Sequence, residues 1–114
     1  MKTIILDTNF IVSALKNKID IFREIERIIE ENYEIKIIDK TINELEKLKD
    51  KLAIKIVNNL EKIKSTEDVD TEIVKNSDKN TIVATLDREL KQRLKNKGAK
   101  TITIRQKTHF KLES

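Results

Sequence analysis

Acidic residues follow two apolar stretches of the sequence in the same way. "IILDTN" runs three apolar residues into Asp7, and "TIVATLD" leads to Asp87. Two further acids, Glu44 and Asp70, follow other segments that we predict to be strands. Carboxylate oxygens are the ligands that Mg²⁺ and Mn²⁺ prefer, and these ions keep waters and contact substrate phosphates. The pattern therefore predicts a divalent-cation site, provided that the four acids converge.

Each acid also has an explanation that requires no chemistry. Asp7, Asp70 and Asp87 could each cap the helix that follows, and Thr41 with Glu44 fits a capping box. A cap contributes only ~1 kcal/mol, whereas two carboxylates ~4 Å apart repel by ~4 kcal/mol at an effective dielectric of 20. Converging acids would therefore destabilise the protein unless a cation lay among them.

The elements that would position these acids alternate between strand and helix. Period-2 patterns and β-branched residues predict strands at 3–6, 33–38, 81–85 and 100–104, with a weak edge strand at 65–69. Apolar residues at helical spacing predict helices over 10–16, 21–31, 41–48, 70–77 and 88–96. A further helix is predicted directly after 41–48, and it is expected to extend through Ile63. Gly98, the single glycine, is a natural end for the last helix.

This alternation predicts an α/β fold in a single domain spanning residues 1–114. Because no hairpin turn separates the strands, we expect them to pair in parallel, with right-handed crossovers that place helices on both faces. The expected architecture is a three-layer α/β/α sandwich with a central parallel sheet of four or five strands. The carboxyl ends of parallel strands share one edge of a sheet, where ligands bind in such folds. We therefore expect the four acids at that edge.

Composition narrows the class of protein further. The chain has no Cys, which excludes disulfides and Cys-based metal sites and fits a reducing, cytoplasmic compartment. Its longest apolar runs are three residues, so we expect no membrane span. Residues 88–111 carry nine Lys/Arg and one acid, although the remainder is mildly acidic. Such asymmetry predicts a polyanionic partner.

Several short motifs resemble those of the PIN-domain nucleases, with matching order and spacing over nearly the whole chain. They are "LDTN", "NEL", an acid three residues before an Ile, and "ATLDREL". The ending "TITIRQKTHFKLE" resembles the archaeal branch that groups VapC-like ribonucleases with rRNA-processing PIN proteins. The resemblance implies an endoribonuclease that uses Mg²⁺ or Mn²⁺ to cut RNA phosphodiester bonds. It would be either the toxin of a toxin–antitoxin pair or an rRNA-processing enzyme.

The resemblance also implies roles for individual residues. The catalytic acids would be Asp7, Glu44, Asp70 and Asp87, of which Asp7, Asp70 and Asp87 would hold the metal. Thr8, Asn9 and Thr85 would hold these acids in position without being ligands themselves. Asp68 competes with Asp70 for the third position, and we prefer Asp70 because Ile73 then falls on the buried face of its helix. Leu86 departs from the family, which often has a polar residue there.

The basic C-terminal quarter supplies the RNA-binding candidates, which are Lys91, Arg93, Lys95, Lys97, Arg105, Gln106 and Lys107. Arg105 is the first choice, because its planar guanidinium can contact a phosphate through two hydrogen bonds. The resemblance leaves three further partners open: an antitoxin, a ribosome-assembly protein and a second copy of the chain.

Other classes of function remain open at this stage. A PIN module without activity could bind RNA or assist ribosome assembly, and Leu86 and the uncertain third acid keep this alternative open. A phosphoacceptor domain would require paired acids after the first strand and a Lys after the last, where this chain has Asp7-Thr8 and Arg105. A phosphatase would require an Asp where Asn9 stands. A requirement for a divalent ion would separate the enzyme from the module without activity.

Overall fold

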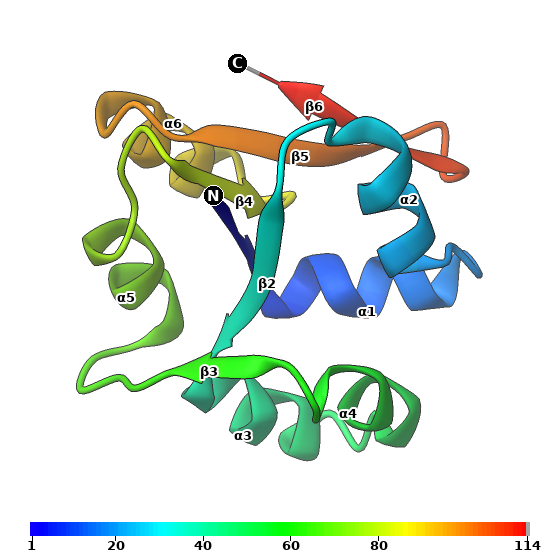
Figure 1. Cartoon of the computed structure of the whole chain (residues 1–114). Helices are drawn as coiled ribbons and strands as arrows, with labels where there is room; N and C mark the ends of the chain where they lie inside the picture. Colours follow the sequence, from blue (N-terminus) through cyan, green and yellow to red (C-terminus); the bar gives the residue numbers. More distant parts are fainter. Residues whose placement is uncertain (114) are drawn as a thin grey trace.

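The computed structural model describes residues 1–113 (Figure 1). The strands are β1 (Lys2–Leu6), β2 (Tyr33–Ile38), β3 (Glu61–Ile63), β4 (Thr81–Ala84), β5 (Lys100–Arg105) and β6 (His109–Glu113). The helices are α1 (Thr8–Lys16), α2 (Ile21–Ile28), α3 (Asp39–Lys47), α4 (Lys51–Val57), α5 (Val69–Lys75) and α6 (Arg88–Asn96). Within this range, each helix is too short or too polar to reach across a lipid bilayer.

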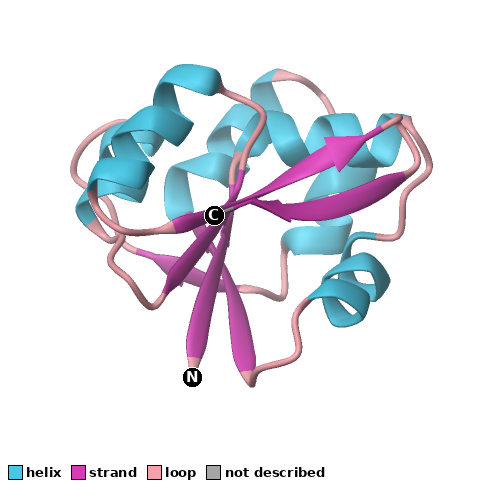
Figure 2. Ribbon diagram, turned by 90° about the horizontal axis from the view of Figure 1, so that it is seen from above, coloured by secondary structure: helices cyan, strands magenta, loops and turns pink. Residues whose placement is uncertain are grey.

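One sheet organises the molecule, and the predicted fold class is confirmed. Across residues 1–113 the sheet has six strands in the order β3-β2-β1-β4-β5-β6, and β6 alone is antiparallel to its neighbour. Figure 2 shows the strands fanning out, as expected of a twisted sheet. The prediction of four or five strands, all parallel, missed β6.

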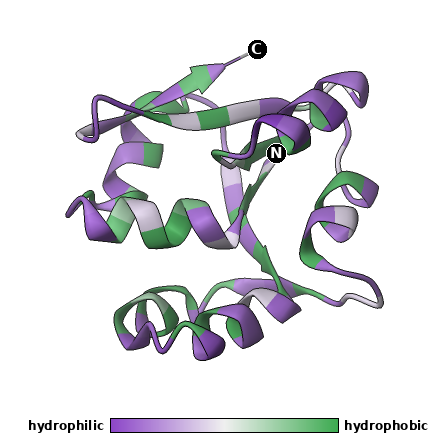
Figure 3. Ribbon diagram, turned by 180° about the vertical axis from the view of Figure 1, so that it is seen from behind, coloured by the Kyte–Doolittle hydropathy of each residue, from purple (hydrophilic) through white to green (hydrophobic). Residues whose placement is uncertain are grey.

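The two faces of the sheet pack against different helices because side chains alternate along each strand. On β1, Ile4 and Leu6 join the core that α1, α2, α3 and α4 cover, whereas Ile5 joins the core beneath α5 and α6. Phe10 and Phe110 meet in the first core, with ring centroids 4.8 Å apart. Figure 3 shows hydrophobic residues along the inner strands and mixed polarity along the helices.

Two local predictions were wrong. The helix expected to reach Ile63 ends at Val57, and the edge strand is β3 rather than 65–69. Asn58 and Asn59 follow Val57, and asparagine is a poor helix former, although the helical spacing of apolar residues continues past it.

The strand β6 was missed because its hairpin lacks the usual turn residues. Gln106 and Lys107 both adopt left-handed backbone conformations, with φ of 54° and 59°, where glycine or asparagine is typical. By contrast, Gly98 has the left-handed conformation expected just beyond a helix, with φ of 78°.

Side chains of α2 cover the outer edge of β6. The Phe110 N–H donates to the Glu24 carboxylate over 2.9 Å, and the Arg27 guanidinium donates to the Phe110 carbonyl over 2.9 Å. Arg27 and Glu24 also pair with each other at 2.9 Å, and the hydrogen bond from Arg27 lowers the pKa of Glu24. The N–H and carbonyl of Phe110 at this edge are thus satisfied by one ion pair.

Candidate active site

The strand order opens a crevice beside β1. After β1 the chain builds β2 and β3 on one side, and it then returns through β4 on the other side of β1. In open α/β sheets, ligands bind outside the carboxyl ends of the strands at such a reversal. Asp7 directly follows β1, and Asp87 lies three residues beyond the end of β4.

Asp7 is buried, with 4% of its surface exposed. Its side chain caps α1, where the Thr8 N–H donates to Oδ1 over 2.9 Å, and the Thr85 hydroxyl donates to Oδ2 over 2.8 Å. The pKa of Asp7 is raised to about 6, first by burial and then by the charges of Asp70 and Glu44. The hydrogen bonds from Thr85 and Thr8 oppose this rise. Asp7 is therefore both a helix cap and a carboxylate that nearby negative charge destabilises.

Glu44 is held by a short chain of hydroxyl groups. The Thr8 hydroxyl bonds to Glu44 Oε1, and it lies 3.2 Å from the hydroxyl of Thr41, which is completely buried. A hydroxyl has one proton to donate, so Thr41 donates to Thr8 and Thr8 donates to Glu44. The capping-box explanation was wrong, because α3 begins at Asp39 with Ile38 as its N-cap, and Thr41 lies inside the helix.

This hydroxyl chain gives a prediction about stability. Thr8→Val should lower the free energy of unfolding by about 1–3 kcal/mol, because it leaves the buried Thr41 hydroxyl without its partner. Adding Thr41→Val removes the unpaired group, so the double variant should be more stable than Thr8→Val alone. Urea denaturation of the native chain, Thr8→Val, Thr41→Val and the double variant measures the coupling energy between the two hydroxyl groups. Simple additivity of the two single changes would contradict the arrangement.

Asp68 and Asp70 have different surroundings. Asp68 is the N-cap of α5 and accepts from the Thr71 N–H over 3.4 Å, and its pKa is lowered first by its hydrogen bond with Thr71. Asp70 follows the first residue of α5 and is half-buried. Its pKa is raised first by burial and then by the charges of Asp87, Asp68 and Glu44. The capping role considered for Asp70 therefore belongs to Asp68.

Asp87 caps α6, as the simpler explanation predicted. Its Oδ1 accepts from the N–H groups of Glu89 and Leu90 over 2.9 and 3.1 Å. The Asp87 N–H donates to the Thr85 hydroxyl over 3.2 Å, so Thr85 contacts both Asp7 and Asp87. Leu86 packs against the core that α1, α2, α3 and α4 cover.

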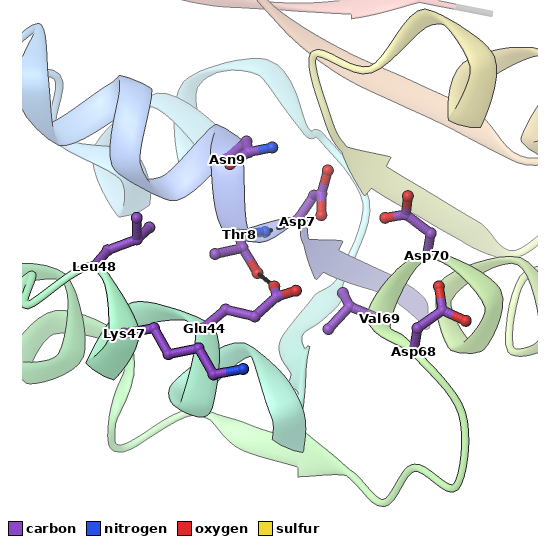
Figure 4. Close-up of a pocket in the computed structure, with 9 residues that line it drawn as sticks. All are labelled: Asp7, Thr8, Asn9, Glu44, Lys47, Leu48, Asp68, Val69 and Asp70. Atoms are coloured by element: carbon purple, nitrogen blue, oxygen red, sulfur yellow. Dashed lines mark hydrogen bonds between the residues drawn. The ribbon is translucent and has the colours of Figure 1, made fainter.

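These elements surround a pocket of about 440 Å³ (Figure 4). Its lining residues come from α1, α3 and the start of α5, and they are Asp7, Thr8, Asn9, Glu44, Lys47, Leu48, Asp68, Val69 and Asp70. Asp87 affects the pocket through its charge on Asp70. In the conformation observed for residues 1–113, no three acidic side chains lie close enough together to coordinate one ion. The oxygens of Asp7 and Glu44 instead face Thr8 and Thr85.

The basic candidates lie in different surroundings. The positive charge of Arg93 adds to the lowering of the Asp68 pKa, which the hydrogen bond with Thr71 dominates, and it opposes the rise that burial causes in the Asp70 pKa. Lys91 is paired with Glu113 at 3.0 Å, and Lys95 and Lys97 are exposed near the end of α6. The tip of the β5–β6 hairpin, with Arg105, Gln106 and Lys107, lies at the opposite end of the molecule from α5 (Figures 1 and 3).

Sequence reasoning overlooked two residues of the site. Lys47 lines the pocket from α3, although its spacing of three residues from Glu44 on a predicted helix was a usable signal. Thr41 was assigned only to a cap, because the sequence does not reveal that it lies beside Thr8.

Known proteins resemble this chain over nearly its whole length. The family model described as a PIN like domain matches residues 4–107. Ribonuclease VapC4 of Methanocaldococcus jannaschii is 33% identical, and the alignment covers 98% of this chain and 97% of that protein. Among solved structures, the PIN domain endonuclease Utp24 has a TM-score of 0.84 and 30% identity, over 97% of this chain and 90% of that one. The similarity thus includes every element that lines the pocket.

Proposed function

The chain belongs to the PIN-like domain family, and we propose that it is a divalent-metal-dependent endoribonuclease. One observation carries the proposal: Asp7 is buried at the strand reversal, and the negative charges of Asp70 and Glu44 raise its pKa further. The two relatives support the class of activity, since one is a ribonuclease and the other an endonuclease.

The donor atoms fit a hard divalent cation such as Mg²⁺ or Mn²⁺. Asp7, Glu44 and Asp70 offer carboxylate oxygens around one pocket, and Asp87 adds its charge from beside Asp70. Burial and then mutual repulsion raise the pKa values of Asp7 and Asp70, and a cation would relieve the repulsion. We assign the metal to Asp7, Asp70 and Asp87, with Glu44 facing it from α3. When bound, such an ion supplies an activated water and stabilises charge on the phosphate.

The other residues of the site orient these acids. Thr85 donates to the Asp7 carboxylate and accepts from the Asp87 N–H, so it ties that carboxylate to the backbone that carries Asp87. The Thr8 hydroxyl donates to the Glu44 carboxylate, and the buried Thr41 hydroxyl in turn bonds to Thr8, so the two hydroxyl groups orient Glu44. We assign Asn9, which lines the pocket beside them, to the same supporting group.

Cleavage assays test the proposal. Purified protein should cut single-stranded or loop RNA in the presence of Mg²⁺ or Mn²⁺, and EDTA should stop the reaction. Adding excess Mn²⁺ after EDTA should restore it. A chain that binds RNA but never cuts it under these conditions would instead be a PIN module without activity.

We also propose that the RNA backbone crosses from the acidic pocket towards basic residues at its rim. Arg93 supports this path, since its charge reaches Asp68 and Asp70. For the hairpin residues, Arg105→Ala with Lys107→Ala should flatten the dependence of log affinity on log salt by about 0.7 for each phosphate that the variant no longer binds. Fluorescence anisotropy across a salt series measures the slope. If the slope is unchanged, the RNA does not contact the hairpin.

Two cellular roles are compatible with this activity, because the same acids would serve both. Resemblance to VapC4 favours a toxin, which an antitoxin would control, and resemblance to Utp24 is consistent with the rRNA-processing role. The RNA that is cut distinguishes them. Sequencing of cleaved ends in cells that express the active chain would reveal either precursor rRNA or other transcripts.

A further inference from the structure

A second pocket continues the acidic one along α3. It has a volume of about 520 Å³ and is lined by Lys40, Asn43, Glu44, Lys47, Asp68 and Val69. Four of these residues, Glu44, Lys47, Asp68 and Val69, also line the first pocket. The two hollows are therefore parts of one groove, which we call the α3 groove, and α3 lines it with Lys40, Glu44 and Lys47.

Lys47 is the free cation of this groove. It lies one helical turn after Glu44 on α3, and Figure 4 shows its ammonium group on the pocket side of the helix beside Glu44. Among residues 1–113 it forms neither an ion pair nor a hydrogen bond, whereas the Lys40 ammonium donates to the Glu67 carbonyl over 2.8 Å. Lys47 thus has three donors available for a ligand.

An exposed apolar side chain lies next to this cation. Leu48 lines the pocket and is 56% exposed, which is unusual here because most large apolar residues of the described chain are buried. Figure 4 places Leu48 on the far side of Lys47 from Asp70. A cation and an apolar side chain in adjacent positions match the two parts of a nucleotide, which are its phosphate and its base.

We propose that the α3 groove is the subsite for the nucleotide next to the cleaved bond, in which Lys47 binds that nucleotide's phosphate and Leu48 contacts its base. The inference rests on the proposed nuclease function and adds the path of its substrate. An acidic pocket repels RNA, so cations must lie on its walls. Lys47 supplies such a cation from α3, where it lines both hollows of the groove.

The experiment measures RNA binding separately from cleavage. Lys47→Ala is placed in an Asp7→Asn background, and the affinity for a short single-stranded RNA is measured by fluorescence anisotropy over a salt series. A variant that binds one phosphate fewer should have a slope smaller by about 0.7. This corresponds to about 5-fold weaker binding at 0.1 M salt, with the difference vanishing near 1 M. Lys47→Arg should retain the slope, because it keeps the positive charge.

Two further variants separate the roles of the charge and the apolar side chain. Lys55→Ala removes the same charge from an exposed position on α4 and should leave the slope unchanged. Leu48→Ala should weaken binding at every salt concentration without altering the slope, since it removes an apolar contact. Equal slopes for Lys47→Ala and Lys55→Ala would overturn the proposal, even if the native chain cuts RNA. Failure of the native chain to cut RNA would instead overturn the proposed function, because the binding assay does not depend on cleavage.

Discussion

Asp7→Asn is expected to slow metal-dependent RNA cleavage by more than about 100-fold, while the protein remains folded. Loss of a residue that only orients a metal ligand commonly costs about 10–100-fold in activity, and Asp7 is proposed to be a ligand itself. Its position supports that role, because it is buried where β1 meets α1. Initial rates with a labelled RNA in Mn²⁺ measure the loss.

A matched variant controls for the other role of Asp7. Asp20 is also an N-cap aspartate, with its carboxylate accepting from the Arg23 N–H at the start of α2. Asparagine caps helices about as well as aspartate, so Asp20→Asn removes one charge and keeps a cap. It should cut RNA at the native rate. If Asp7→Asn were equally active, the observed cleavage would come from a different site or a contaminating nuclease.

Without metal, the same Asp7→Asn variant is expected to be more stable than the native chain, by about 1–3 kcal/mol at pH 7–8. The pKa of Asp7 is about 6 in the fold, against an ordinary value of 3.8, so folding disfavours its charged form. Asparagine stays neutral and escapes this penalty. Urea denaturation in EDTA measures the difference.

The pH dependence follows from the direction of the shift. Between pH 3.8 and about 6 the folded state holds a proton on Asp7 that the unfolded state has lost. The contribution of Asp7 to stability therefore falls as pH rises through this window, and the full penalty remains above it. The advantage of Asp7→Asn should be small at pH 4 and constant above about pH 7. If Asp7→Asn were more stable than the native chain by the same amount at every pH, the charge of Asp7 would not be the cause of the difference.

Addition of Mn²⁺ should reverse this order. An ion that binds only the folded state stabilises it by about 4.1 kcal/mol at one thousand times its dissociation constant, which exceeds the advantage of Asp7→Asn. The native chain should gain this stability, and Asp7→Asn should gain little of it. A melting temperature of the native chain that does not respond to Mn²⁺ would contradict a site at these acids.

The fold was predictable because its strongest signals are local. Apolar runs bounded by Asp7 and Asp87 predicted the two central strands, and helical spacing predicted the position of α6. The errors fall where local signals and tertiary packing disagree. The apolar spacing of α4 continues past its true end, and the hairpin before β6 uses Gln106 and Lys107 in conformations that their residue types do not indicate.

The candidate site was predictable in its parts but not in its hydrogen bonds. Of the four acids expected at one edge of the sheet, Asp7, Glu44 and Asp70 line one pocket, and Asp87 is not among its lining residues. Which oxygen accepts from which donor depends on packing between segments distant in sequence. The bond between Thr8 and Thr41 spans 33 residues, and the bond from Thr85 to Asp7 spans 78. No spacing pattern encodes such pairs.

The ion pair of Glu24 and Arg27 over β6 also bears on how copies of the chain meet. An exposed edge strand is a template on which another chain can add a strand, which leads to aggregation. Here the outward N–H and carbonyl of Phe110 are already bonded to Glu24 and Arg27. An incoming strand would have to displace both hydrogen bonds, and at the other edge of the sheet it would find only the three residues of β3. The Glu24–Arg27 pair therefore opposes the addition of a strand at Phe110 of β6.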